Sequence, residues 1–229
     1  MTIHHESQDP DIALTPAQQQ RLSRALARVE GVADGLGHRI DPGILHAVAM
    51  LNELGVNTHA SCEGHVGWAT GGPYIDIVSP QYLPMKHEFR ALGDDPSLSD
   101  KRACLREKMK VANAVEGKKV LPILDEFYKD RQSSYGSRIG LWFYGAGITR
   151  IESVGVAFLG AETDSATKEA LLRAFQDEMR AFSDFLAVHE PAGAPSPAVG
   201  ASPSQPPDPQ GPRSLRESSI AKPSARRIG

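Results

Sequence analysis

Four short apolar segments, grouped in two pairs, constrain the fold of this chain more than any other feature. Residues 56–60 and 73–78 lie on either side of a glycine-rich loop, and residues 139–144 and 148–159 lie on either side of Gly145-Ala146-Gly147. A glycine turn between two strand-like segments is typical of a β-hairpin. Because strand and helix patterns do not alternate regularly, we expect a mainly antiparallel sheet.

Helix patterns surround both strand pairs. Thr15-Pro16-Ala17-Gln18 combines an N-cap threonine, a proline in the first turn and a capping-box glutamine, and Asp41-Pro42 repeats the start signal. Further helical patterns cover most of residues 82–131 and about 165–188. The predicted order is ααββααββα. We therefore expect an α+β domain in which about five helices pack on a sheet of about four strands.

The composition changes near residue 190, and this change indicates a domain boundary. Residues 190–229 hold nine of the 17 prolines and no Phe, Trp or Tyr. Such a segment cannot bury enough apolar surface to offset the entropy of ordering it. We predict a flexible N-terminus over 1–13, a single α+β domain over 14–189 and a disordered Pro/Ser/Ala-rich tail over 190–229.

Charge and composition narrow the classes of function. The 25 basic and 28 acidic side chains give a net charge of -3, so nucleic acid is an unexpected partner. We expect no membrane span, because no run of about 18 apolar residues is present. The polar start MTIHHESQDP is unlike a secretory signal, and two cysteines fit a reducing compartment, so we expect a cytoplasmic protein. P-loop, dinucleotide-binding, H-E-x-x-H and G-x-S-x-G motifs are absent from the sequence.

The densest functional signal lies in the loop that we predict over His59–Gly72. A thiol, a carboxylate and two imidazoles occur within the seven residues His59-Ala60-Ser61-Cys62-Glu63-Gly64-His65, and glycines follow them. Glycines permit unusual backbone angles and the close approach of a ligand. Loops carried by a rigid sheet are also where binding groups concentrate.

Two of the interpretations of this loop are catalytic. His59, Cys62 and His65 offer three ligands for zinc, and Glu63 would then act as the base for a metal-bound water. Alternatively, Cys62 is a nucleophile whose base is His65 or His59, with Glu63 orienting the imidazole. A structural interpretation also fits, in which Cys62 is a core residue and Glu63 pairs with His65.

A further interpretation is a binding site for a small polar molecule. Backbone N–H groups around Gly64, together with Ser61 and His65, would donate hydrogen bonds, and Trp68 and Tyr74 would offer stacking faces. Asp76 lies in the middle of the second predicted strand and shares a side with Tyr74. Its carboxylate is either on the solvent face or directed toward the loop as a ligand or base.

The remaining charged residues suggest solvated surfaces. Arg138 and Arg150 flank the second predicted hairpin, and we expect both at the surface. The basic stretch between Lys101 and Lys119 is interrupted by Glu107 and Glu116, so a solvated helix surface is expected there too.

Two short resemblances fall on the same loop. Residues 58–65, Thr-His-Ala-Ser-Cys-Glu-Gly-His, are similar to the T-x-S-S-C-S-G-R motif of the tRNA wybutosine-synthesis methyltransferase family, with Glu63 in place of Ser and His65 in place of Arg. Ser61, His65 and Asp76 have partial counterparts in the metallopeptidase signature S-x-H-x-x-G-x-A-x-D, although His65 and Asp76 are eleven apart instead of seven. Neither similarity extends along the chain, so we assign the chain to neither family.

The sequence therefore predicts a small cytoplasmic protein with a polar-ligand site or active site over His59–Gly72. As an enzyme it would hydrolyse a small polar or phosphorylated compound, using a metal-bound water or Cys62. One alternative is a regulatory module that binds a ligand at this loop without turnover. Another is an interaction protein that acts through its C-terminal tail. Zinc is the one cofactor that these residues suggest, and the sequence does not indicate an oligomeric state.

Overall fold

The computed structural model describes residues 13–33, 37–66, 71–160 and 162–190. The flexible N-terminus and the disordered tail predicted from the sequence fall almost entirely outside these residues, and so does Trp68. None of the described helices is both long enough and apolar enough to cross a membrane.

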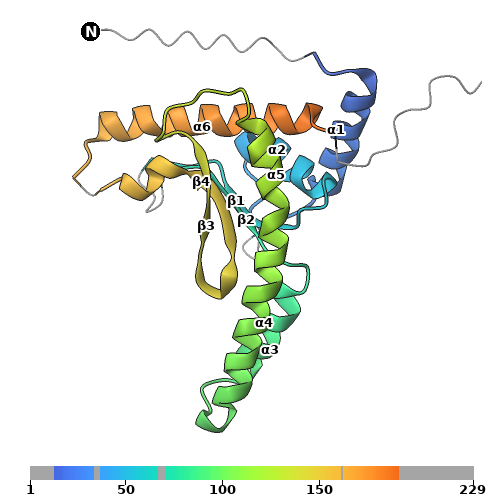
Figure 1. The fold of residues 1–229 in the computed structure, drawn as a ribbon, viewed down its shortest axis with the longest axis vertical. Helices are drawn as coiled ribbons and strands as arrows, with labels where there is room; N and C mark the ends of the chain where they lie inside the picture. The colour runs from blue at the N-terminus through green and yellow to red at the C-terminus, as the bar shows by residue number, and fades with distance from the viewer. Residues whose placement is uncertain (1–12, 34–36, 67–70, 161, 191–229) are drawn as a thin grey trace, which may run out of the picture. The chain divides into compact units, whose positions relative to one another are not determined.

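A four-stranded antiparallel sheet is the centre of the fold, which confirms the predicted α+β class (Figure 1). The strands are β1 (Thr58–Cys62), β2 (Tyr74–Ile77), β3 (Ile139–Phe143) and β4 (Thr149–Ser153). Their order across the sheet is β1-β2-β4-β3, so the two predicted pairs join through β2 and β4. Strand β1 is consequently an edge strand.

One face of the sheet forms the hydrophobic core. Residues opposite each other in antiparallel strands point to the same side of the sheet. In one such row Ile75 pairs with Ile151, which pairs in turn with Leu141. This face is buried with residues of α2 (Pro42–Glu53) and α6 (Ser165–Val188), including Met50 and Phe182. The opposite face carries the polar and aromatic rows that are described below.

The helices begin where the sequence signals predict. Thr15 caps α1 (Pro16–Val29), and its hydroxyl accepts the Gln18 N–H while the Gln18 side chain accepts the Thr15 N–H, which completes the predicted capping box. Helix α2 starts at Pro42, directly after Asp41, and α6 has the predicted bounds. Helices α1 and α6 both pack against α2.

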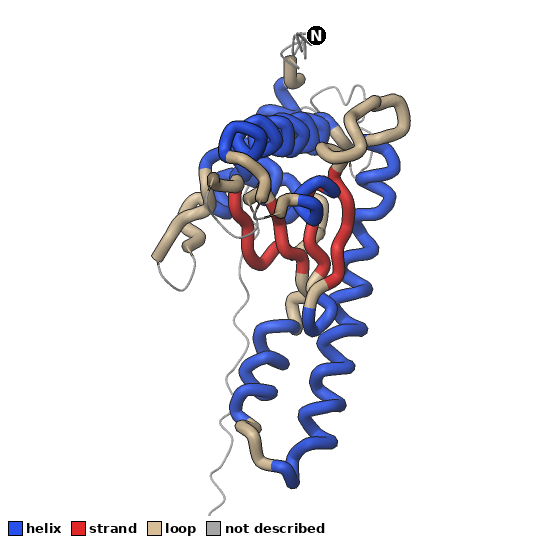
Figure 2. Tube along the Cα trace, turned by 90° about the vertical axis from the view of Figure 1, so that its left-hand side faces the viewer, coloured by secondary structure: helices blue, strands red, loops and turns tan. Residues whose placement is uncertain are grey.

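The segment between the two strand pairs holds one helix more than the predicted order. Helices α3 (Tyr82–Ala91) and α4 (Ser99–Gly117) form an antiparallel pair that extends beyond the sheet, as Figure 2 shows, and α5 (Leu121–Phe127) follows. Short 3₁₀ turns connect the elements: η1 (Pro96–Leu98), η2 (Lys118–Val120), η3 (Gly145–Gly147) and η4 (Val154–Phe158).

The predicted bounds of two strands are wrong. Strand β4 ends at Ser153 instead of continuing to residue 159, because the chain enters the 3₁₀ turn η4 there. Gly155 of this turn lies so close to Phe175 that an added Cβ would be 2.9 Å from the ring. Strand β1 starts later than predicted and ends at Cys62. His59, Ser61 and Cys62 therefore belong to a strand, and the loop itself starts at Glu63.

The basic stretch on α4 is largely neutralised by its neighbours, in agreement with the expected solvated surface. Four of its side chains form ion pairs with nearby carboxylates: Lys101 with Glu88, Arg102 with Asp94, Lys110 with Glu107 and Lys119 with Glu116. The guanidinium groups of Arg102 and Arg106 also stack on the Phe89 ring.

Candidate functional site

Three side chains that differ in chemistry converge beside the end of β1. A carboxylate oxygen of Asp41, the thiol sulfur of Cys62 and a ring nitrogen of His65 all lie within 4.8 Å of one another. His65 Nε2 is 3.7 Å from Asp41 Oδ2. Among the described residues, no other group of three His, Cys, Asp or Glu side chains meets in this way. We call these residues the donor triad.

Asp41 joins the triad because it does not cap its own helix. It occupies the N-cap position of α2, where an aspartate usually accepts a backbone N–H of the first turn, yet its side chain makes no such bond. Instead Asp41 Oδ2 accepts the Glu63 N–H at 3.0 Å, and Glu63 Oε2 accepts the Gly43 N–H at 2.8 Å. Glu63 of the loop therefore caps α2, whereas the side chain of Asp41, at the N-cap position, binds the loop.

The loop after β1 is held from two sides. Gly64 has φ +84°, and a Cβ at this position would lie 2.8 Å from the backbone of Gly72 and of Pro73. The Gln176 side chain, on α6, donates hydrogen bonds to the carbonyl oxygens of Glu63 at 3.1 Å and Gly64 at 3.3 Å. The geometry of the donor triad is thus fixed by α2, by α6 and by the left-handed backbone at Gly64, a conformation that glycine adopts without strain.

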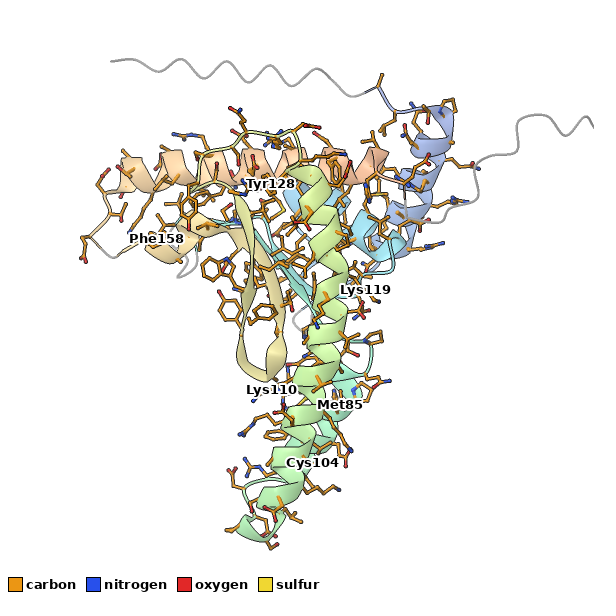
Figure 3. The ribbon with its side chains drawn as sticks, in the orientation of Figure 1. Met85, Cys104, Lys110, Lys119, Tyr128 and Phe158 are labelled. Carbon is orange, nitrogen blue, oxygen red and sulfur yellow. The ribbon has the colours of Figure 1, made fainter. Side chains whose placement is uncertain are left out.

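Cys62 is buried within this arrangement, with 7% of its surface exposed. Its sulfur accepts the Gly64 N–H at 3.4 Å. Burial raises the pKa of the Cys62 thiol, and the carboxylate of Asp41 adds to the increase. Because a nucleophilic cysteine needs a lowered pKa and access to solvent, the surroundings of Cys62 favour a metal ligand or a core residue over a nucleophile. The other cysteine, Cys104, is exposed on the α3–α4 pair (Figure 3).

The other candidate residues divide between the site and the scaffold. His59 lies at a β-bulge between Thr58 and Ala60, and its ring packs edge-to-face on Tyr82 at a centroid distance of 5.5 Å. Burial, together with the charge of Lys86, lowers the pKa of His59. The donor triad contains Asp41 where the sequence suggested His59.

Glu63 acts as a helix cap in the structure, and Tyr74 lies opposite Cys62 in the β1–β2 register. Burial raises the pKa of the Tyr74 hydroxyl, so it stays protonated at neutral pH. Asp41 is not a site residue that the sequence predicts, because Asp41-Pro42 indicates only a helix start. Its distance of some twenty residues from the Cys62 loop left no local pattern to find.

Asp76 is neither on the solvent face nor part of the donor triad. Arg150 binds it with two hydrogen bonds, from Nε to Oδ1 at 2.7 Å and from a terminal nitrogen to Oδ2 at 3.0 Å. The guanidinium carbon of Arg150 lies 3.8 Å from the Tyr74 ring centroid and 4.8 Å from that of Tyr144. The expectation that Arg150 is a solvated surface residue is therefore wrong, because its side chain is only 15% exposed.

A cleft of about 700 Å³ extends along β1 and includes the donor triad in its lining. One wall is formed by Asn57 and strand β1, which includes Ser61. The other wall comes from the end of α1 and the residues just after it, from α2 and from residues 38–41. A larger hollow of about 910 Å³ lies around Asp177 and Arg180, which pair with each other, and contains none of the triad residues. The chemistry of the described residues therefore points to the β1 cleft.

Comparison of the chain with models of protein families, with curated proteins and with solved structures gave no match. Any function must accordingly be argued from the geometry of the site.

Proposed function

We propose that the protein is a zinc-dependent hydrolase whose metal ligands are Asp41, Cys62 and His65. The observation that carries this proposal is the convergence of one oxygen, one nitrogen and one sulfur donor from two separate segments of the chain. These are the three ligand types that zinc accepts in proteins, and the sulfur favours zinc over magnesium or calcium.

The number of ligands supports a catalytic role over a purely structural one. Structural zinc sites usually have four protein ligands, whereas catalytic sites have three and leave one position for water or substrate. The donor triad supplies three, and each of its members lines the cleft of about 700 Å³. This volume is in the range of sites for small molecules. Zinc in such a site makes its bound water acidic and polarises a carbonyl or phosphoryl group.

The backbone contacts around the triad support pre-organised ligands. Asp41 is oriented by the Glu63 N–H and Cys62 by the Gly64 N–H. Partners of this kind fix the orientation of metal ligands and contribute to affinity. Tyr74, protonated and adjacent in the cleft lining, is suited to donate a hydrogen bond to a bound substrate.

Elemental analysis of the purified, zinc-supplemented chain tests the metal assignment. We expect about one equivalent of zinc in the wild type and the loss of most of it in Asp41→Asn, Cys62→Ala and His65→Ala. His59→Ala is the matched control, because it removes an imidazole from β1, the strand that carries Cys62, without changing a residue of the triad. Loss of zinc in His59→Ala with full retention in Asp41→Asn would replace the triad by His59, Cys62 and His65. No zinc in the wild type would overturn the proposal.

Hydrolysis is tested with p-nitrophenyl acetate and p-nitrophenyl phosphate. We expect turnover of one of them that a chelator abolishes, that zinc restores and that Asp41→Asn lacks. A protein that holds zinc but hydrolyses neither ester, nor any peptide, would instead be a ligand-binding module that uses the same site.

A further inference from the structure

The free edge of β1 is a second feature of the cleft. Among the residues that the structure describes, β1 pairs only with β2, and its other edge faces the cleft. Two backbone groups on this edge have side-chain partners: the Thr58 N–H donates to Asn52 Oδ1 at 3.3 Å, and the Glu63 N–H donates to Asp41 Oδ2 at 3.0 Å. Because backbone groups alternate in direction along a strand, the N–H and C=O of Ser61 lie on the same edge as those of Glu63.

The dimensions of the cleft match an extended chain. Strand β1 has five residues, which at the rise of a β-strand correspond to about 17 Å. The facing wall contains the exposed side chain of Val32 and the largely buried side chains of Val29 and Val48, while Arg39 supplies a positive charge. The side chains of an added strand would alternate between the two faces of the sheet, so half of them would lie on the face that α2 covers, and Arg39 suits a carboxylate of the ligand.

The donor triad lies at the end of this edge of β1. Cys62 is the last residue of β1, and Asp41 accepts the backbone N–H of the next residue on the same edge. A peptide paired with β1 would therefore pass directly beside the triad.

We propose that the substrate of the hydrolase is a short extended peptide, which pairs with the free edge of β1 at Ser61 and so brings one of its amide bonds to the donor triad. This inference rests on the proposed zinc-dependent hydrolysis. The reaction adds water across the C–N bond: the hydroxyl joins the carbonyl carbon, the proton joins the leaving nitrogen, and a carboxylic acid and an amine result. No oxidant, reductant or second substrate is needed.

The test uses the full zinc-loaded chain and three hydroxamates, which chelate zinc through the same head group. The first is acetohydroxamate, which reports on the metal alone. The second is acetyl-Val-Ala-Ala-hydroxamate, and the third is the same peptide with both alanine amides N-methylated. We expect the peptide to bind at least tenfold more tightly than acetohydroxamate, since each net backbone hydrogen bond contributes about fivefold. N-methylation should remove this gain.

Ser61→Pro and Ser61→Ala separate the backbone from the side chain. Proline removes the Ser61 N–H at an edge position where proline is tolerated, whereas alanine keeps it. We expect Ser61→Ala to bind the peptide like the wild type and Ser61→Pro to lose about fivefold, while both retain zinc and bind acetohydroxamate unchanged. If Ser61→Pro loses zinc, the peptide inference is tested by the wild type alone, through its affinity for the peptide with and without N-methylation.

The outcomes distinguish the two proposals. Equal binding of the peptide and acetohydroxamate, with zinc present, would overturn the peptide inference and leave the hydrolase intact. Absence of zinc and of acetohydroxamate binding would overturn the hydrolase. A dimer of the wild type that Ser61→Pro dissociates would show that a second copy, not a substrate, occupies the edge, and would also overturn the inference.

Discussion

Asp41 and Asp76 both lie close enough to Tyr74 to raise the pKa of its hydroxyl, yet the two carboxylates have different roles. Asp76 is 7% exposed and binds Arg150 through both of its oxygens, and the guanidinium stacks on Tyr74 and Tyr144. Asp41 is about a third exposed and lies beside Cys62 and His65, while the side chain of Glu63 caps α2 in its place. The first carboxylate is neutralised within the protein, and the second is placed with other metal donors beside a cleft.

The difference indicates how to separate a structural carboxylate from a functional one. A buried carboxylate that is paired with a guanidinium stabilises the fold only while both partners are present. A partly exposed carboxylate with a neighbouring thiol and imidazole adds little to folding and retains its capacity for a cation. The predictions below test this distinction between the Asp76–Arg150 pair and the donor triad.

The largest expected effect comes from removing Arg150. Arg150→Ala leaves the Asp76 carboxylate buried without its cation, and we expect a loss of about 4 kcal/mol in the free energy of unfolding. Urea denaturation followed by circular dichroism measures it. Asp41→Asn, which keeps an oxygen acceptor for the Glu63 N–H, should cost less than about 1 kcal/mol in the metal-free protein.

Arg180→Ala is the control for Arg150→Ala. It removes a guanidinium from an ion pair with Asp177 in which the arginine side chain is 67% exposed, so we expect a change below about 0.5 kcal/mol. If Arg150→Ala is as mild as this control, the Asp76–Arg150 pair is not structural, and the distinction between the two carboxylates fails.

The second effect concerns the glycine that shapes the loop of the donor triad. Gly64→Ala adds a Cβ at φ +84° that overlaps the backbone of Gly72 and Pro73, and we expect a loss of roughly 3 kcal/mol together with weaker zinc binding. Gly93→Ala is matched to it, because Gly93 also has a positive φ but no atom within 4 Å of the added Cβ.

Gly93→Ala should cost only about 1 kcal/mol, from backbone strain alone. The difference between the two variants in thermal denaturation then measures the close approach at Gly64. Equal losses would mean that the loop backbone can move aside, and that the geometry of the donor triad is not fixed by this contact.

The sequence was sufficient for those features that depend on neighbours along the chain. The capping box at Thr15 and Gln18, the start of α2 at Pro42 and the bounds of α6 follow from local signals, and the structure contains them. The α+β class followed from the two strand pairs. The extent of the strand after Thr149 did not, because the 3₁₀ turn that follows Ser153 places Gly155 against Phe175, a contact between distant residues that no local pattern encodes.

The candidate site shows the same limit. Cys62 and His65 were identified because they are close in sequence, and the structure brings them together. Asp41 was missed because its place in the triad depends on the exchange of capping roles with Glu63 across twenty residues. Arg150 was misjudged for a similar reason, since its partner Asp76 lies on a strand 74 residues away in sequence. Long-range polar pairs are where local reasoning is weakest.

The smallest effect is a pH dependence in the structural cluster, by which we mean Asp76, Arg150, Tyr144 and Glu152. Glu152 is 3% exposed, and burial raises its pKa although the Tyr144 hydroxyl, which donates to Oε1 at 2.6 Å, and Arg150 both act in the opposite direction. Between the unfolded and the folded pKa values, the unfolded chain has lost this proton while the folded chain retains it. Stability from this group must therefore fall as the pH rises through that window.

Glu152→Gln keeps the Oε1 acceptor for Tyr144 but cannot ionise. We expect the variant to match the wild type in free energy of unfolding near pH 3, where the carboxyl is protonated in both states, and to exceed it at neutral pH. Urea denaturation of both proteins across this range measures the difference. A difference that is constant with pH would show that Glu152 titrates alike in both states. A lower stability of the variant at neutral pH would show instead that ionised Glu152 stabilises the fold through its attraction to Arg150. Two carboxylates, Asp76 and Glu152, would then share one guanidinium.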